Sequence, residues 1–355
     1  MKERILRLQE QLDDRSAFYI ENPVNRRYLT NFTSSAGFVV VTRKNCFFFT
    51  DFRYFENAKK QVSSCAVLEF QGFSRSILPT LKENGVKTLY LETDFATLQG
   101  FKMLQDLADG ITVSCENNLD ALLNEMRMIK TKEEIRCISQ AQRISEATFD
   151  YILERLEVGR SEIDIMLDME FYLRKLGSEG ISFDFIVVSG KNSSLPHGVP
   201  TEKSIEKGDF VTMDFGAVVN GYHSDMTRTI AVGEISEKQK FVYDTVLQAK
   251  NLAIHSIAPG KICKEIDKIA RDHIHHAGFE GCFGHGLGHS VGLEIHEDPS
   301  FNTRCETKLQ PGMVLTVEPG VYLANEFGVR IEDMVVITKD GYTNLTETTD
   351  QLLVL

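Results

Sequence analysis

The chain has 355 residues, a net charge of −12 at pH 7 and 42% hydrophobic residues, which is an ordinary globular composition. Its length predicts two domains, because single cores stop growing near ~250–300 residues. The acidic balance argues against a nucleic-acid surface, and no run approaches the ~18 apolar residues of a membrane span. The seven cysteines are scattered, with no Cys-x-x-Cys pair. We therefore expect free thiols, no disulfide, no thiolate metal site and a cytoplasmic location.

The first part of the chain, residues 1–122, alternates predicted strands and helices, which is an α/β pattern. Helices are expected at Arg53–Val62 and Leu78–Glu83. Strands are expected at Ala17–Glu21, Gly37–Thr42, Cys46–Thr50, Ala66–Phe70, Val86–Glu92 and Ile111–Cys115. This part contains no histidine. We therefore expect a domain for packing or oligomerisation, without catalytic chemistry of its own.

The second part, residues 123–355, groups its helices and strands in blocks, which predicts an α+β domain. The domain boundary is expected between Asn117 and Lys130. Capping residues mark the starts of three helices after it, and three strands follow near the end of the chain. The helices are expected to begin after Thr131, Ser161 and Ser236, and the strands to lie at Met313–Val317, Gly320–Tyr322 and Val329–Thr338.

A hairpin in the middle of the second part places two aspartates together. Asn220-Gly221 is a two-residue turn signal between strand-like runs. In that register Asp214 faces Thr227, so Asp214 and Asp225 share one face as diagonal neighbours, roughly 7–8 Å apart at the backbone. An aspartate inside an apolar strand needs a partner or a metal if it is buried.

Two glutamates in similar contexts follow a histidine-rich glycine run. Glu318 ends an apolar run and Glu332 interrupts another, while residues 284–297 contain three histidines. Four carboxylates carry a charge of about −4, which two divalent cations would balance. The oxygen-rich set with an imidazole suits Mn²⁺, Co²⁺, Fe²⁺ or Zn²⁺, whereas a structural zinc would need cysteines. We therefore expect one centre holding two divalent ions, Mn²⁺ foremost.

The order of these motifs resembles the metallopeptidases of the pita-bread fold. That family includes methionine aminopeptidase, Xaa-Pro aminopeptidase (aminopeptidase P) and Xaa-Pro dipeptidase (prolidase). The motifs are Met213–Gly216, Ser224–Thr229, His285–His289, Gly292–Glu297, Thr316–Gly320 and Val329–Asp333. The resemblance covers Met126 to Leu355. Residues 1–122 look like the creatinase-type domain that precedes the catalytic domain in the proline-specific members, on the runs Tyr28–Gly37 and Phe49–Tyr54.

The resemblance implies a role for each site residue. The implied metal ligands are Asp214, Asp225, His289, Glu318 and Glu332. Glu318 would also move a proton between the attacking water and the leaving proline nitrogen, and His296 would donate a hydrogen bond to the oxyanion. His197 and Arg330 would hold the proline side of the substrate. His285 would lie outside the metal ligands.

The resemblance further implies hydrolysis of the Xaa-Pro bond at the N-terminus of peptides, by a homodimer whose first domains help to wall the partner's active site. The run Phe32–Gly37 resembles aminopeptidase P, so we expect that activity first. Prolidase shares every motif and stays open, with Arg330 as the candidate reader of the free proline carboxylate. Methionine aminopeptidase lacks that arginine and the preceding domain. A non-catalytic binding module is disfavoured by the intact ligand set.

Overall fold

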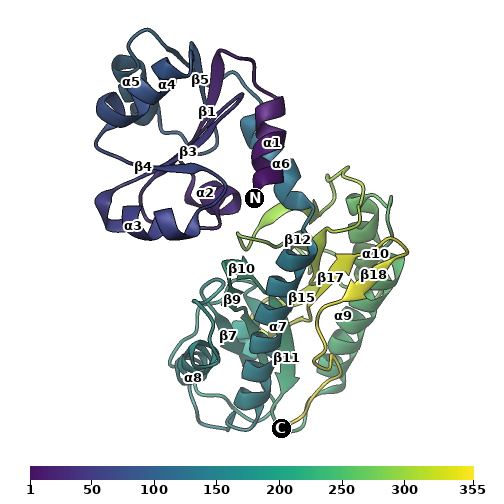
Figure 1. Cartoon of the computed structure of the whole chain (residues 1–355). Coiled ribbons are helices and arrows are strands. Elements are labelled where there is room, and N and C mark those ends of the chain that lie inside the picture. The colour runs from purple at the N-terminus through teal and green to yellow at the C-terminus, as the bar shows by residue number, and fades with distance from the viewer. The chain divides into compact units, whose positions relative to one another are not determined.

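The computed structural model describes residues 1–355 and divides the chain into two compact units, Met1–Arg127 and Met128–Leu355 (Figure 1). Helix α6, Leu119–Met128, contains both this division and the predicted boundary after residue 122. No helix combines the length and the apolar character that crossing a membrane requires.

The first unit is a mixed six-stranded sheet with helices between its strands. The order of strands is β4-β3-β2-β1-β5-β6. Strand β1 pairs antiparallel with β2 and parallel with β5. All six predicted strands are present. The elements are α1 Lys2–Glu10, β1 Ser16–Ile20, α2 Pro23–Thr30, β2 Phe38–Thr42, β3 Cys46–Thr50, α3 Phe52–Gln61, β4 Ala66–Glu69, a π-helical turn Phe73–Ile77, α4 Leu78–Glu83, β5 Thr88–Leu91, α5 Leu98–Leu107, β6 Thr112–Ser114 and α6.

The expectation that every cysteine is a free thiol is wrong for one pair. Cys46 and Cys65 form a disulfide, with their Cα atoms 4.8 Å apart. The reason is the parallel pairing of β3 with β4, which sets Phe47 opposite Ala66 and so brings the two preceding residues together. Sequence spacing does not reveal this neighbourhood, because it depends on the strand register. The other five cysteines are free.

The second unit packs two helix pairs onto antiparallel sheets. Its sheet orders are β11-β8-β7, β13-β12-β14-β17-β18 and the two-stranded ribbons β10-β9 and β15-β16. The elements are α7 Lys132–Leu153, α8 Glu162–Lys175, β7 Ile186–Ser189, a 3₁₀ turn Gly190–Ser194, β8 Phe210–Phe215, β9 Val218–Val219, β10 Tyr222–His223, β11 Met226–Ala231, α9 Glu237–Ser256, α10 Cys263–His276, β12 Gly288–Ser290, β13 Glu297–Phe301, β14 Val314–Val317, β15 Gly320–Leu323, β16 Phe327–Arg330, β17 Asp333–Ile337 and β18 Tyr342–Asn344.

Helices α7, α8 and α9 begin at the predicted caps. The side chains of Thr131 and Ser236 close reciprocal capping boxes with Glu134 and Gln239. Such a cap satisfies two backbone N–H groups that the first turn of a helix leaves unpaired. Ser161 caps α8 by accepting from a backbone N–H three residues on.

One predicted strand is in fact two. The run Val329–Thr338 is divided between β16 and β17, which belong to different sheets. The chain changes sheets at Ile331-Glu332, where the backbone N–H of Glu332 donates to the carbonyl of Thr227 at 3.1 Å instead of to a strand neighbour. The change of sheet leaves Glu332 between two strands.

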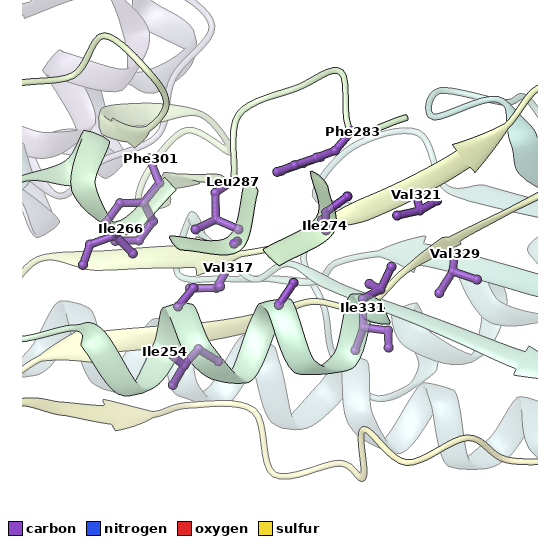
Figure 2. Packing of buried hydrophobic residues seen from close by; sticks show 14 of the residues in the cluster. Ile254, Ile266, Ile274, Phe283, Leu287, Phe301, Val317, Val321, Val329 and Ile331 are labelled. Carbon is purple, nitrogen blue, oxygen red and sulfur yellow. The ribbon is translucent and has the colours of Figure 1, made fainter. Parts of the chain in front are cut away.

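The larger hydrophobic core anchors the strands that adjoin Glu318 and Glu332. Helices α9 and α10 contribute Ile254, Ile266 and Ile274, and these pack in one cluster with Val317 and Ile331 (Figure 2). Because side chains alternate along extended chain, burying Val317 and Ile331 turns the neighbouring Glu318 and Glu332 away from this core.

Candidate metal centre

The hairpin puts its aspartates where the sequence predicts. Met213 and Phe215 are buried in the core cluster that also contains residues of α7 and α8, so Asp214 between them points to the other face of β8. Asp214 faces Thr227 across the ladder to β11, and Asp225 lies just before that strand. Asp214 and Asp225 are close enough for their carboxyl groups to interact directly.

The predicted ligands converge on one place. Carboxylate oxygens of Asp225 and Glu332 and a ring nitrogen of His289 all lie within 4.8 Å of one another. The Nε2 atom of His289 is 3.4 Å from Oδ2 of Asp225 and 3.5 Å from Oε1 of Glu318. Asp214 belongs to the same cluster because its carboxyl group interacts with that of Asp225. Asp214 lies in β8 and His289 in β12, strands of two different sheets, whereas Asp225, Glu318 and Glu332 lie at strand ends, and the first and last of the five are more than a hundred residues apart in the chain.

The tautomer of His289 follows from its other nitrogen. Nδ1 lies 3.1 Å from the carbonyl oxygen of Ser290, which can only accept a hydrogen bond, so Nδ1 carries the proton. That leaves the lone pair of Nε2 facing the carboxylates of Asp225 and Glu318. An imidazole held in this way is the usual form of a metal ligand.

The electrostatics of the cluster call for cations. One oxygen each of Asp214, Asp225 and Glu332 is buried and accepts no hydrogen bond. Burial and the neighbouring acids raise the pKa values of Asp225 and Glu332 well above their ordinary range, and burial raises the pKa of Glu318 to about 7. Buried carboxylates without donors are costly unless a positive charge compensates them. Divalent metal ions fit this oxygen-rich set with one imidazole.

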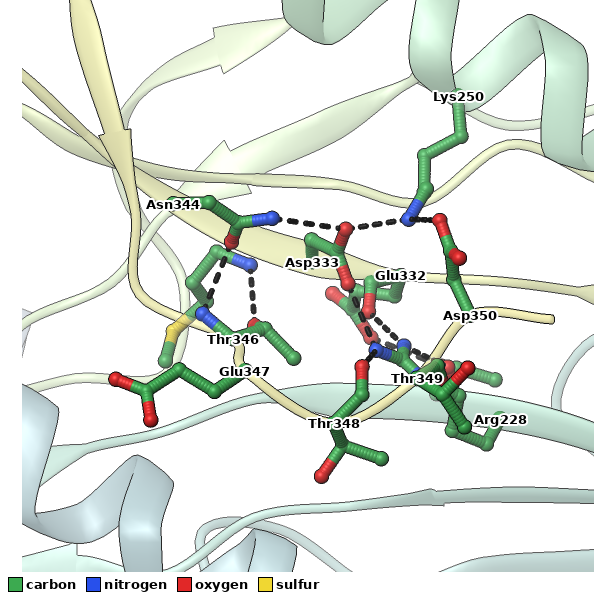
Figure 3. A network of polar contacts seen from close by, with 12 residues as sticks. Arg228, Lys250, Glu332, Asp333, Asn344, Thr346, Glu347, Thr348, Thr349 and Asp350 are labelled. Atoms are coloured by element: carbon green, nitrogen blue, oxygen red, sulfur yellow. Dashed lines mark hydrogen bonds and ion pairs between the residues drawn. The ribbon is translucent and has the colours of Figure 1, made fainter.

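Hydrogen bonds from neighbouring side chains hold Glu332 in place. The hydroxyl of Thr227 donates to Oε2 of Glu332 at 2.8 Å. Behind it, the guanidinium of Arg228 donates to the main-chain carbonyl of Glu332 and to the carboxylate of Asp333 (Figure 3). Asp333 also accepts from Lys250, which is completely buried. The peptide unit that carries a predicted ligand is therefore fixed by a buried ion network.

Close contacts with backbone or with a buried side chain explain two of the glycines in the histidine run. A Cβ atom on Gly288 would lie 2.1 Å from the carbonyl oxygen of Thr316, so only glycine lets β12 approach β14. A Cβ on Gly292 would lie 2.4 Å from the carboxylate of Glu297. That carboxylate binds Lys130 at 3.0 Å and accepts the backbone N–H groups of residues 293 and 294, which fixes the loop before His296.

The remaining histidines take distinct places. The ring of His296 lies 4.4 Å from that of His289, centroid to centroid, and burial, followed by the neighbouring His289 ring, lowers the pKa of His296. His197 is exposed on the loop after β7. Both line a cavity of about 950 Å³ together with Asp214, Asp225, His289 and Glu318. The cavity therefore opens onto four of the five predicted ligands.

His285 stays away from the ligands. Its Nδ1 meets the carbonyl of Gly286 at 2.8 Å and its Nε2 meets the hydroxyl of Tyr322 at 3.0 Å. Burial, with a contribution from Arg330, lowers the pKa of His285 to about 4. The ring is therefore neutral at physiological pH and serves Tyr322, a residue that no sequence signal singled out.

Arg330 is occupied by the protein itself. Its guanidinium binds the carboxylate of Asp214 at 2.6 Å, the hydroxyl of Tyr322 at 2.8 Å, and the carbonyl of Pro196 at 3.1 Å. Its Nε donates to Thr227 at 3.2 Å. These contacts make Arg330 a clamp on a predicted metal ligand. The predicted contact between Arg330 and the substrate stays a prediction.

Comparison with known families decides the assignment. The model of metallopeptidase family M24 matches residues 136–339, more than half of the chain, and the model of the creatinase/prolidase N-terminal domain matches residues 4–129. The chain belongs to metallopeptidase family M24. The expected architecture, a creatinase-type domain before a pita-bread catalytic domain, is confirmed.

Relatives of this M24 peptidase extend over its whole length. An Xaa-Pro dipeptidase of Pyrococcus furiosus is 38% identical over 99% of this chain and 100% of that protein. The solved structure of an Xaa-Pro dipeptidase from Bacillus anthracis has a TM-score of 0.95 at 41% identity, covering 99% of both chains. An X-Pro aminopeptidase from Thermotoga maritima has a TM-score of 0.91 at 34% identity, covering 98% of this chain and 100% of that one.

Proposed function

We propose that this M24 peptidase hydrolyses the bond between a first residue and a proline in second position, and that the free Xaa-Pro dipeptide is its preferred substrate. The observation that carries the proposal is the cluster of five predicted ligands, in which three buried carboxylate oxygens accept no hydrogen bond and four of the five side chains line one cavity. Full-length similarity to Xaa-Pro dipeptidases supports the choice of substrate. The sequence alone favoured the aminopeptidase, and this similarity favours the dipeptidase instead.

The proposed ligands of two divalent ions are Asp214, Asp225, His289, Glu318 and Glu332, and Mn²⁺ is the proposed metal, ahead of Co²⁺, Zn²⁺ and Fe²⁺. When bound, such ions lower the pKa of a water molecule and polarise the scissile carbonyl. The protein supplies the rest. It fixes Glu332 through Thr227 and orients His289 through the carbonyl of Ser290.

Three side chains are proposed to act on the substrate. Glu318 receives the proton of the attacking water and passes it to the proline nitrogen, which leaves as a secondary amine and needs that proton. His296, exposed at the cavity wall beside His289, donates its N–H to the oxyanion. His197, exposed at the cavity wall, contacts the proline side of the substrate. Arg330 contributes by holding Asp214 in place.

A length series tests the proposal. The purified chain with Mn²⁺ should hydrolyse Ala-Pro and Gly-Pro faster than Ala-Pro-Ala, and should leave Ala-Ala intact. A stronger rate on the tripeptide would favour the aminopeptidase. Release of an N-terminal methionine from a peptide without proline would point instead to methionine aminopeptidase, and a metal content below about one ion per chain would point to a non-catalytic module.

The assembly and location expected from the resemblance remain predictions. We propose a homodimer in the cytoplasm. Sedimentation equilibrium of the purified chain tests the first, and cell fractionation tests the second.

A further inference from the structure

The first unit contains a cavity of its own, with a volume of about 470 Å³. Its walls come from β1, β2, the π-helical turn and α5, and every lining residue lies between positions 19 and 107. Six of the lining side chains are aromatic: Tyr19, Phe38, Phe70, Phe73, Phe95 and Phe101. Cavities of ~300–1,000 Å³ with apolar walls and a few polar groups are the usual sites of small-molecule ligands.

The cavity lies where two parallel strands end. Strands β1 and β5 run side by side in the sheet, with Tyr19 opposite Leu91 (Figure 1). Glu21 directly follows β1 and Glu92 directly follows β5, and both glutamates line the cavity. Ligands of open α/β sheets bind outside the carboxyl ends of such strands, so the topology favours a ligand site at this edge of the sheet.

The two glutamates differ in their contacts. Glu92 is buried, and its oxygens accept hydrogen bonds from two backbone N–H groups at 2.6 and 2.8 Å and from the side chain of Asn25 at 2.7 Å. The side chain of Glu21 is exposed, and its carboxylate accepts no hydrogen bond from the protein. Glu92 therefore holds the local backbone in place, whereas the carboxylate of Glu21 is open to a ligand.

The hydroxyl of Tyr19 also lacks a partner in the protein. Tyr19 is 5% exposed and its ring stacks on that of Phe38 with centroids 5.2 Å apart, but its hydroxyl makes no hydrogen bond. A buried tyrosine hydroxyl ordinarily makes one. Burial, and after it the charge of Glu21, raises the pKa of Tyr19, so the two groups lie within electrostatic reach of each other. One polar group of a ligand can therefore contact both.

The charges around the cavity favour a cation. Two glutamates line it, and no lysine, arginine or histidine does. Burial raises the pKa of Glu21 and the charge of Arg26 opposes that rise, but Arg26 lies outside the lining and donates to Ser34. An anionic ligand would be repelled, and a neutral one would leave Glu21 without a counterion. Aromatic faces attract cations as well.

We propose that this cavity binds a small organic cation, an ammonium group attached to an apolar body, as in an aralkylamine. The carboxylate of Glu21 and the hydroxyl of Tyr19 hold the ammonium group, and the surrounding aromatic rings hold the apolar body. The site lies within the first unit, and the proposed peptidase activity belongs to the second. The two proposals therefore stand or fall separately.

The test compares three probes of similar size and different charge: 2-phenylethylamine, 3-phenylpropionate and 2-phenylethanol. Their dissociation constants are measured by ligand-observed NMR titration of the full-length, metal-loaded protein. The amine should bind about 10-fold more tightly than the alcohol, which is the lower end of what one charge-assisted hydrogen bond contributes. The carboxylate should bind more weakly than the alcohol, because it meets two glutamates and no cation.

Four variants assign the binding to this cavity. Glu21→Gln should weaken binding of the amine by about 10-fold and leave the alcohol within about twofold. Tyr19→Phe, which keeps the ring, should weaken the amine by about 2- to 10-fold. Asp94→Asn is the matched control, since Asp94 is exposed two residues after Glu92, carries the same charge and does not line the cavity. Ala96→Leu adds apolar volume inside the cavity and should weaken both the amine and the alcohol.

Several results would overturn the inference. No measurable binding of the amine, or binding of the alcohol as tight as that of the amine, would show that the cavity does not recognise a cation. Equal losses in Glu21→Gln and Asp94→Asn would mark a general effect of net charge. Amine binding that survives Ala96→Leu would place the amine at another site, such as the acidic centre of the second unit.

A second copy of the chain is the competing occupant of the cavity. If Ala96→Leu converts a dimer into monomers in sedimentation experiments, an apolar side chain of that copy fills the cavity, and the inference fails. Circular dichroism checks that each variant keeps its fold, and Tyr19→Phe and Glu21→Gln carry the test if Ala96→Leu does not. None of these failures affects the length series on Xaa-Pro substrates, which tests the proposed function.

Discussion

Replacement of Lys250 by methionine probes the buried ion network behind the metal centre. Lys250 comes from α9, is completely buried and binds two carboxylates, those of Asp333 and Asp350 (Figure 3). Burial alone would raise the pKa of Asp333, but Arg228 and Lys250 outweigh burial and hold that pKa below its ordinary value. Asp333 is therefore charged in the folded protein and depends on both cations.

The expected loss of stability follows from what remains after the substitution. Breaking a buried pair from one side costs ~3–5 kcal/mol, because the other charge stays buried without its partner. Here Asp333 keeps Arg228 at 2.9 Å and Asn344 at 3.1 Å, and Asp350 is 26% exposed and can be hydrated. Methionine also refills most of the volume. We therefore expect the low end of the range, about 3 kcal/mol.

Urea unfolding followed by far-UV circular dichroism measures this loss, since the chain has no tryptophan to report by fluorescence. Lys238→Met is the matched control on the same helix. Its ion pair with Glu326 is half exposed on both sides, so its loss should cost less than about 1 kcal/mol. Lys250→Met should also bind Mn²⁺ more weakly, because Asp333 adjoins Glu332. Unfolding curves of the two variants that coincide would refute this account of the network.

Three further predictions concern other parts of the chain. Glu318→Gln should abolish turnover of Ala-Pro while circular dichroism stays that of the wild type; wild-type rates would remove Glu318 from the proposed mechanism. The folded, metal-free protein holds protons on Glu318, Asp225 and Glu332 more tightly than the unfolded chain does. The contribution of protonated Glu318 to the free energy of unfolding is therefore complete below pH 4.5 and is lost as pH rises through about 7. The Tm of metal-free protein should thus fall over that interval, by the equivalent of up to about 3 kcal/mol from Glu318, and saturating Mn²⁺ should suppress the fall; a Tm that rises instead would contradict it. Under non-reducing conditions Cys65→Ser should cost the first unit about 3 kcal/mol through the lost link to Cys46, and identical unfolding of wild type and variant would show that the disulfide does not stabilise this unit.

The upstream half of the metal site could be predicted from the sequence because its information is local. The Asn220-Gly221 turn sets the register, and the alternation of side chains then fixes which face Asp214 occupies. The structure has the predicted pairing of Asp214 with Thr227. The starts of the helices could be predicted from equally local information, since a capping box such as that of Thr131 and Glu134 is complete within four residues.

The features that escaped prediction depend on tertiary contacts. Two partners of Arg330, Asp214 and Pro196, are more than a hundred residues away in the sequence, so neither the burial of Arg330 nor its contact with Asp214 could be foreseen. The division of one apolar run at Glu332 has the same cause, because the backbone there bonds to Thr227 in another sheet. Periodicity describes a segment, and it does not say which sheet the segment joins.

The wide spacing of the ligands along the chain has a consequence for biosynthesis. Thr227 and Glu332, whose side chains touch in the folded site, are separated by 105 residues. A nascent chain that has exposed Asp214 and Asp225 offers two carboxylates on one hairpin, with neither the imidazole nor the glutamates. Such a fragment has no selectivity for one ion over another, since selectivity in these sites comes from geometry. We therefore expect metal binding by the proposed ligands to be a late event that follows closure of these long loops, with the choice of ion made by the folded protein.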